Sequence, residues 1–171
     1  MTDFSKFIRE VPDFPQPGIL FKDITPLLQD PRAFRDAVDA MAAHYEPKNI
    51  DVVVGIDARG FIFGSALAYR LGIGFVPVRK SGKLPYLTHE ASYELEYGVD
   101  TLAVHQDACS SGSRVLICDD VIATGGTIAA SIELVEKLGS EVAGIAVLIE
   151  LTFLNGREKF PDQDIFSLIE F

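Results

Sequence analysis

Hydrophobic positions along the chain follow two alternating patterns. Short apolar runs rich in β-branched residues predict buried strands at residues 50–57, 73–80, 113–120, 141–151 and 165–171. Apolar residues at helical spacing predict helices at residues 31–46, 60–72 and 127–139. This alternation is typical of an α/β fold, so we expect a mainly parallel, twisted sheet flanked by helices.

The N-terminal part of the chain has a different pattern. Residues 11–31 hold five of the nine prolines, and proline removes a backbone donor and disfavours helix interiors. Apolar side chains such as Phe14 and Phe21 make this stretch too hydrophobic for a flexible linker. We therefore expect an extended, irregular arm in residues 1–30 and a core in residues 31–171, together forming a single structural domain.

Composition and charge limit the classes of partner. The 171 residues suit one domain, and a net charge of -10 repels nucleic acid. No apolar run reaches the roughly 18 residues of a membrane span, and the charged N-terminus argues against export. Cys109 and Cys118 make neither a disulfide framework nor a metal-binding spacing. We expect a cytoplasmic protein without membrane or nucleic-acid partners.

The stretch VLICDDVIATGGT, residues 115–127, carries the most specific chemistry. A predicted strand runs into two adjacent acids, Asp119 and Asp120, and then into a turn of small residues before a helix. Backbone N–H groups at a helix N-terminus can cradle a phosphate, and carboxylates can accept hydrogen bonds from the hydroxyls of a ribose. The stretch therefore predicts a ribose 5-phosphate site. An ordinary strand end followed by a helix start is the alternative, while Walker and dinucleotide-binding glycine motifs are absent.

Other candidate residues follow neighbouring strands. Arg59, in GIDARGFIFG, offers a guanidinium suited to phosphate oxygens. VRKSGKLP brings three cations next to a glycine, which suits a lid over a polyanion, although a solvated loop is the alternative. Residues 93–98 and 100–105 can pair as antiparallel strands, with Glu94 and Glu96 on one face.

Taken in order, these blocks resemble the adenine-using branch of the type I phosphoribosyltransferase family. The resemblance runs from about Val11 to Phe160, and it includes VPDFPQPGILFKDITPLL, SYELEYG and LIELTFLNGREKF beside the motifs above. It implies the type I phosphoribosyltransferase fold, with residues 1–30 as a small N-terminal hood that binds the base. It also implies a purine-salvage enzyme that converts adenine and phosphoribosyl pyrophosphate into AMP and pyrophosphate.

The resemblance assigns residues to each part of the substrates. The ribose 5-phosphate would be held by Asp119, Asp120, Ala123, Thr124, Gly125, Gly126 and Thr127. The pyrophosphate would be held by Asp57, Ala58, Arg59, Arg79, Lys80 and Lys83. The adenine would be held by Leu20, Phe21 and Lys22, through stacking on Phe21 and backbone groups near Leu20.

Catalysis would depend on Glu96, Tyr97 and Arg59. Glu96 would take the proton of the base, Tyr97 would help to close the site, and Arg59 would stabilise the leaving pyrophosphate. Residues 80–98 would form a lid, in which residues 86–91 match the family only loosely and receive no role.

The resemblance further implies a homodimer and Mg²⁺ carried mainly by the substrate, with Asp119 and Asp120 as the candidate protein ligands. Three alternatives stay open at this point. One is the same chemistry on another base, such as xanthine, hypoxanthine or orotate. The second is a non-catalytic regulator that senses phosphoribosyl pyrophosphate, and the third is an α/β interaction domain without a ligand.

Overall fold

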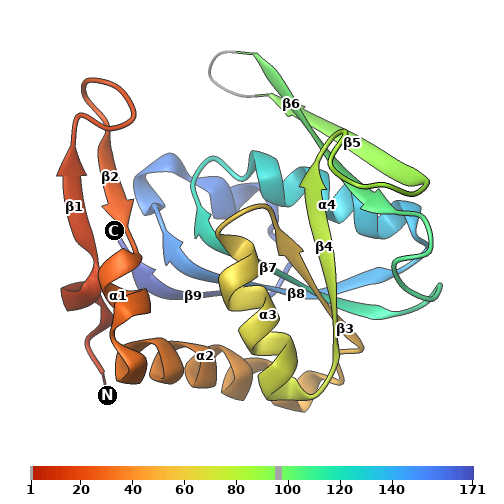
Figure 1. Cartoon of the computed structure of the whole chain (residues 1–171), viewed down its shortest axis with the longest axis horizontal. Coiled ribbons are helices and arrows are strands. Elements are labelled where there is room, and N and C mark those ends of the chain that lie inside the picture. Colours follow the sequence, from red (N-terminus) through yellow and green to blue (C-terminus); the bar gives the residue numbers. More distant parts are fainter. Residues whose placement is uncertain (1, 95–97) are drawn as a thin grey trace.

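The computed structural model describes residues 2–94 and 98–171 and contains a central sheet with the strand order β5-β6-β4-β3-β7-β8-β9 (Figure 1). Neighbours from β4 to β9 are parallel, and the β5–β6 hairpin extends this sheet through antiparallel pairing with β4. The strands are β3 Val52–Ile56, β4 Gly74–Lys80, β5 Thr88–Glu94, β6 Val99–His105, β7 Arg114–Ile122, β8 Glu141–Glu150 and β9 Ile165–Glu170. The predicted α/β fold with a mainly parallel sheet is confirmed.

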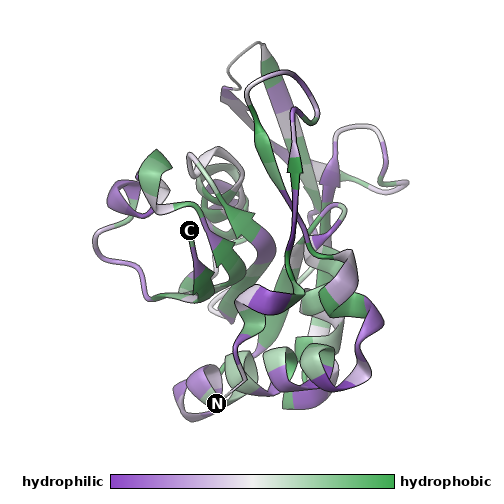
Figure 2. Cartoon of the chain, turned by 90° about the vertical axis from the view of Figure 1, so that its left-hand side faces the viewer, coloured by the Kyte–Doolittle hydropathy of each residue, from purple (hydrophilic) through white to green (hydrophobic). Residues whose placement is uncertain are grey.

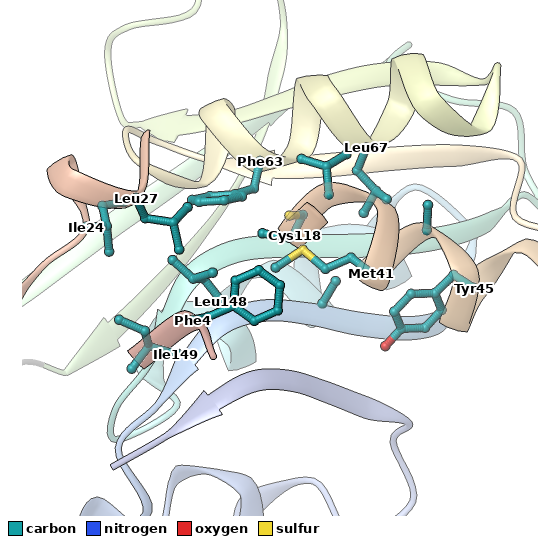
Figure 3. Close-up of a cluster of buried hydrophobic side chains, with 14 of the residues drawn as sticks. Phe4, Ile24, Leu27, Met41, Tyr45, Phe63, Leu67, Cys118, Leu148 and Ile149 are labelled. Carbon is teal, nitrogen blue, oxygen red and sulfur yellow. The ribbon is translucent and has the colours of Figure 1, made fainter. Parts of the chain in front are cut away.

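Helices cover both faces of the sheet, because successive side chains of a strand point to opposite sides. On one face, α2 (Pro31–Tyr45) and α3 (Gly60–Leu71) pack over Leu116 and Cys118 of β7. On the other face, α4 (Gly126–Lys137) packs over Val115 and Ile117. Figure 3 shows the first of these layers, and Figure 2 shows the strands between the helices largely in the hydrophobic colour. The three predicted helices are therefore confirmed.

The N-terminal arm is more regular than expected. β1 (Arg9–Pro12) and β2 (Leu20–Asp23) form a two-stranded antiparallel hairpin, which the turn Phe4–Phe7 precedes and the short helix α1 (Thr25–Gln29) follows. The expectation of an irregular arm is wrong for these residues, because Pro15 and Pro17 lie in the connection between the two strands and only Pro12 lies in a strand, at its last residue, where the missing donor is tolerated. The hairpin stands at one end of the sheet beside the C-terminus (Figure 1).

Two strand bounds also differ from the expectation. β5 begins at Thr88 rather than at residue 93. Its first residues are mostly polar, and only Ala91 among them is buried, so the sequence gives little sign of a strand there. β7 continues to Ile122, so the acid pair lies inside a strand rather than at its end. Among the described residues, no helix is both long and apolar enough to cross a membrane.

A buried tyrosine and a glycine join α2 to the sheet. The hydroxyl of Tyr45 donates to the carbonyl oxygen of Ile145 at 2.7 Å and to that of Asp164 at 3.2 Å. The ring lies directly against Gly144, where any Cβ atom would overlap Tyr45 Cε1. Burial raises the pKa of the Tyr45 hydroxyl, which stays protonated and can keep donating.

Gly144→Ala should lower the free energy of unfolding by about 1–3 kcal/mol, the usual cost of forcing an extra methyl into a packed core. Gly74→Ala is the matched control, because a Cβ there would meet only Val52 Cγ2 at 3.6 Å, an ordinary contact. Urea denaturation of both variants measures the difference, and equal stabilities would contradict a tight Tyr45–Gly144 contact.

Candidate active site

The turns that follow β3 and β7 lie at the same edge of the sheet, since these two strands are parallel neighbours. In open parallel sheets, ligands bind outside the carboxyl ends of the strands. The acid pair, the start of α3 and the start of α4 are therefore brought together as the sequence predicts.

The acid pair is buried, with Asp119 8% exposed and Asp120 5% exposed. Oδ1 of Asp119 accepts a hydrogen bond from the backbone N–H of Asp120 at 2.9 Å. The same oxygen lies where a Cβ of Gly60 would be only 2.9 Å away, so a glycine at the start of α3 makes room for the carboxylate. The first acid is thus fixed by backbone groups of two adjoining elements.

The second acid faces Arg59. Nη2 of Arg59 lies 2.9 Å from Oδ2 of Asp120 as an ion pair. The alignment is not that of a hydrogen bond, and within residues 2–94 and 98–171 this buried oxygen accepts none. A buried acceptor without a partner is costly unless a ligand supplies a donor or a cation. The geometry therefore fits a carboxylate that receives a hydroxyl group or a metal ion.

Burial dominates the ionisation of both acids. It raises the pKa of Asp119 well above the usual range, and the neighbouring charge of Asp120 raises it further. Burial also raises the pKa of Asp120, although the guanidinium of Arg59 opposes this shift. Without a ligand, the folded protein therefore holds two carboxylates whose charge is unfavourable.

The turn after β7 encloses a cavity of about 210 Å³. It is lined by Tyr93, Glu94, Val121, Ala123, Thr124, Gly125, Gly126 and Thr127. Gly125 has a φ of +82° and comes directly before α4, which therefore presents its first N–H groups to this space. All five turn residues that the sequence singles out meet here.

Sequence reasoning missed two contacts of this turn. Tyr93 of β5 lies against Gly126, where a Cβ would be 3.0 Å from its ring. Its hydroxyl donates to Asp100 at 3.3 Å, and burial, followed by that carboxylate, raises the pKa of Tyr93 to about 12. On the other side, a Cβ at Gly156 would overlap the carbonyl oxygen of Ala123. Both residues lie in blocks that carry the family resemblance, SYELEYG and LIELTFLNGREKF, but the sequence does not show which residues they contact.

The residues expected at the pyrophosphate fall into three groups. Asp57 binds Arg79 Nε at 3.1 Å and lies 3.8 Å from Lys83 Nζ, with the exposed Ala58 next to it. Lys80 instead contacts Asp100 of the β5–β6 hairpin at 2.6 Å.

The third group is Arg59 alone, which pairs with Asp120 rather than with Asp57 or Asp100. Its guanidinium sits beside Asp120 and over the ring of Phe21, with Cζ 5.0 Å from the ring centroid. Arg59 therefore links the acid pair to the N-terminal hairpin.

The N-terminal β1–β2 hairpin closes a second cavity, of about 120 Å³. It is lined by Ile19, Leu20, Phe21, Lys22, Arg59, Val121 and Leu151. Phe21 is held by edge-on contact with Phe14, with ring centroids 5.1 Å apart. Leu151, which follows β8, is a further lining residue that sequence reasoning missed.

The charged group of Lys22 is already engaged. Its ammonium forms an ion pair with Glu10 across the hairpin and lies 3.8 Å from the ring centroid of Phe171. Only the backbone and the aliphatic part of Lys22 are left for a ligand. Two further predicted residues, Glu96 and Tyr97, lie outside the described residues.

Comparison with known proteins adds an independent finding. Residues 24–170 match the sequence model of the phosphoribosyl transferase domain. The chain is 59% identical over 164 residues to the adenine phosphoribosyltransferase of Acidobacterium capsulatum, a match that covers 96% of this chain and 91% of the relative.

Solved structures agree with this match. The adenine phosphoribosyltransferase of Thermoanaerobacter pseudethanolicus superposes with a TM-score of 0.96 at 55% identity, covering 99% and 98% of the two chains. The Saccharomyces cerevisiae enzyme, solved with adenine and an imino-altritol bisphosphate, superposes with a TM-score of 0.93 at 44% identity, covering 97% and 96%.

Replacing both acids, Asp119→Asn with Asp120→Asn, should raise the melting temperature of the ligand-free protein by about 2–4 °C, or about 1 kcal/mol. The amides are nearly isosteric and remove two buried charges. The pKa of each acid is higher in the folded state than in the unfolded state. At a pH above the unfolded-state pKa, the charged acid therefore destabilises the folded state. At a pH where both states are protonated, this cost disappears.

The gain should therefore shrink as the pH falls toward about 4. Thermal unfolding at several pH values measures it, and titration with ribose 5-phosphate should show weaker binding to the double variant. A lower melting temperature at neutral pH, or unchanged ribose 5-phosphate affinity, would contradict this account of the acid pair.

Proposed function

The chain belongs to the phosphoribosyltransferase family, and from this premise we propose that it makes AMP by transferring the 5-phosphoribosyl group of phosphoribosyl pyrophosphate to adenine. Pyrophosphate is the second product, and the reaction serves purine salvage. One observation carries the proposal: Val121 lines both the cavity of the turn formed by residues 123–127, called the phosphate turn below, and the cavity closed by the β1–β2 hairpin. A single nucleotide can therefore place its phosphate and its base on the two sides of this residue.

The ribose 5-phosphate part of the ligand belongs between the acid pair and the phosphate turn. Asp119 and Asp120 are the acceptors for the two ribose hydroxyls, and Oδ2 of Asp120, which accepts no hydrogen bond among the described residues, supports this role. The N–H groups and hydroxyls of residues 123–127 are the donors for the 5-phosphate.

The pyrophosphate belongs near Asp57, Ala58, Arg79 and Lys83. Lys80 would contact it from the side of the β5–β6 hairpin. These cations are paired with Asp57 or Asp100 in the free protein, so binding exchanges one carboxylate partner for a phosphate partner. Arg59 would act at the boundary between ribose and base, where it contacts Asp120 and Phe21.

Residues 1–30 act as the hood over the base, with the β1–β2 hairpin as its working part. Phe21 offers a flat apolar surface, and the backbone near Leu20 and Lys22 offers an N–H and a C=O to the N1/N6 edge of adenine. An oxo purine would place an oxygen against that carbonyl and leave two acceptors unpaired, which selects for an amino purine.

The chemistry forms a bond between N9 of adenine and C1′ of the ribose while the bond from C1′ to pyrophosphate breaks. The ribose becomes cation-like, and Arg79, Lys80 and Lys83 stabilise the departing charge. We assign removal of the N9 proton to Glu96 and closure of the site to Tyr97. Residues 80–98 exclude water, which would otherwise hydrolyse the activated sugar.

Mg²⁺ belongs to this proposal as an ion carried largely by the oxygens of the sugar donor, where it neutralises the pyrophosphate. The chemistry of the donor set fits this arrangement. Asp119 and Asp120 are oxygen ligands of the kind that Mg²⁺ prefers, and one of their oxygens has no hydrogen bond among the described residues. No group of three or more candidate metal-ligating side chains occurs in the described chain.

We also infer a homodimer in the cytoplasm. The outer face of α3 carries Tyr69, which is 90% exposed, and Ile62, which is 37% exposed, two turns apart on one side of the helix. Such an apolar stripe suits contact with a second copy of the chain. Cys109 and Cys118 are both free thiols, as is usual in a reducing compartment.

Purified protein with Mg²⁺ and phosphoribosyl pyrophosphate should convert adenine into AMP and leave hypoxanthine and guanine unchanged. Chromatographic separation of nucleotides measures the product, and incubation with the sugar donor alone controls for hydrolysis. Turnover of an oxo purine would favour the alternative base. Tight binding of the donor without any turnover would favour the phosphoribosyl pyrophosphate sensor.

Glu96→Gln should lower kcat by about 10²–10⁴-fold, the usual contribution of a general base, while the affinity for phosphoribosyl pyrophosphate stays nearly constant. Steady-state kinetics and calorimetric titration of the donor separate the two effects. Equal losses in turnover and donor affinity would argue that Glu96 binds the donor instead.

A further inference from the structure

The segment from Leu151 to Asp164, which joins β8 to β9, touches both parts of the proposed site. Leu151 lines the cavity closed by the hairpin, next to Val121 and Phe21. Gly156 lies against the phosphate turn, where its Cα leaves no room for a Cβ beside the carbonyl of Ala123. The approach is also tight from the side of the turn, since a Cβ at Gly125 would be 3.0 Å from the carbonyl oxygen of Gly156.

Hydrophobic packing holds this segment at Leu151 and Phe160, which are partly buried against the core, while Phe153 and Leu154 are exposed. Residues 152–155 are exposed, and Gly156, which has no side chain to pack, is the one buried residue from 151 to 164, all of which the structure describes. Its two short turns, Thr152–Leu154 and Gly156–Lys159, are single 3₁₀ turns with few internal bonds. Beyond these two residues and the hydrogen bond that the Thr152 hydroxyl donates to the carbonyl of Phe171, the position of the segment depends on further polar contacts.

Arg157 supplies these contacts. Its Nε donates to Oε1 and Oε2 of Glu150 at 2.9 and 3.1 Å, and its Nη2 also reaches Oε2. On the other side, Nη1 donates to the carbonyl of Ile165 at 2.8 Å and Nη2 to Oγ of Ser167 at 3.1 Å. One guanidinium thus connects the end of β8, the middle of the segment and the start of β9.

The Glu150 carboxylate is fixed in turn. Glu150 is 6% exposed, and the hydrogen bonds from Arg157 lower the pKa of its carboxyl group, so it stays charged at neutral pH. A planar guanidinium on a buried carboxylate is a strong, directional contact that a lysine cannot reproduce.

We propose that Arg157 and Glu150 are positioning residues for phosphoribosyl transfer, because their ion pair holds one segment against both the phosphate turn and the base cavity. This inference rests on the proposed function for its meaning in catalysis. Neither side chain lines either cavity, so both act through Gly156 and Leu151. Loosening the pair should disturb both subsites together, which a defect in a single subsite would not do.

The test compares Arg157→Ala with Arg114→Ala. Arg114 also pairs with a glutamate, Glu141, and also donates to two backbone carbonyls, those of Lys48 and Asn49, but at the amino ends of the strands. Calorimetry with adenine probes the base cavity and calorimetry with ribose 5-phosphate probes the phosphate turn. Steady-state kinetics with both substrates gives kcat and each KM.

Arg157→Ala should weaken both ligands and lower kcat/KM for both substrates by about tenfold or more, since a misplacement of ~1 Å can cost roughly 10²-fold in rate. Arg114→Ala should stay within about twofold of the wild type even if its melting temperature falls equally. Arg157→Lys should recover only part of the loss. Affinities and kinetics of Arg157→Ala that match those of Arg114→Ala would overturn the proposal.

If Arg157→Ala does not fold, Glu150→Gln decides by the same criteria, because it keeps the shape of the side chain and removes only the charge. The two fragment affinities keep this test separate from the proposed function. A wild type that forms no AMP would refute the enzyme reaction, whereas unaltered fragment binding in Arg157→Ala or Glu150→Gln would refute only the positioning role.

Discussion

The burial of two adjacent carboxylates is the constraint on which the site depends. Asp119 and Asp120 lie within a central strand, so the sheet that gives the fold its stability also takes both charges out of water. The backbone N–H of Asp120, the bare start of α3 at Gly60 and the guanidinium of Arg59 partly compensate the cost. The remaining imbalance favours ligands that bring hydroxyl donors or a cation to this edge.

The cationic residues show the opposite arrangement. Arg79 and Lys83 share Asp57, while Lys80 is paired with Asp100, so each of these three cations already lies in an ion pair in the free site. A protein of net charge -10 can in this way keep a site for a polyanion without a large region of one sign. A buried acid pair that is short of hydrogen-bond donors and cations that already lie beside carboxylates are then complementary preparations for one substrate.

Periodic features could be predicted from the sequence, and contacts between irregular segments could not. The strands and helices of the core follow from hydrophobic spacing, and the strand VLIC, the acid pair and the small-residue turn follow from their order along the chain. The β1–β2 hairpin was not predicted because its prolines suggest irregular backbone, although Pro15 and Pro17 lie between the strands and only Pro12 lies within one. The start of β5 was not predicted because Ala91 is the one buried residue of this strand, which leaves no clear hydrophobic pattern.

The contacts that hold the site in place could not be predicted from the sequence for a different reason. Gly156 contacts Ala123 through backbone atoms alone, and Arg157 binds Glu150 within an irregular segment that has no hydrophobic periodicity. Arg59 was assigned to the pyrophosphate by its place after β3, yet its guanidinium turns toward Asp120 and Phe21. The direction in which such a side chain points depends on which strands are neighbours in the sheet, and the order of residues along the chain does not show this.

Asp57 has a consequence for selectivity among anions. Its carboxylate forms ion pairs with Arg79 and Lys83 and so takes the place that a ligand anion would have. On the proposed assignment, any anion that enters must compete with this tethered group, whose effective concentration is high because it belongs to the same chain. Inorganic phosphate and other small anions of the cell gain little from such an exchange. A pyrophosphate anchored through its sugar is tethered as well, so it competes on equal terms.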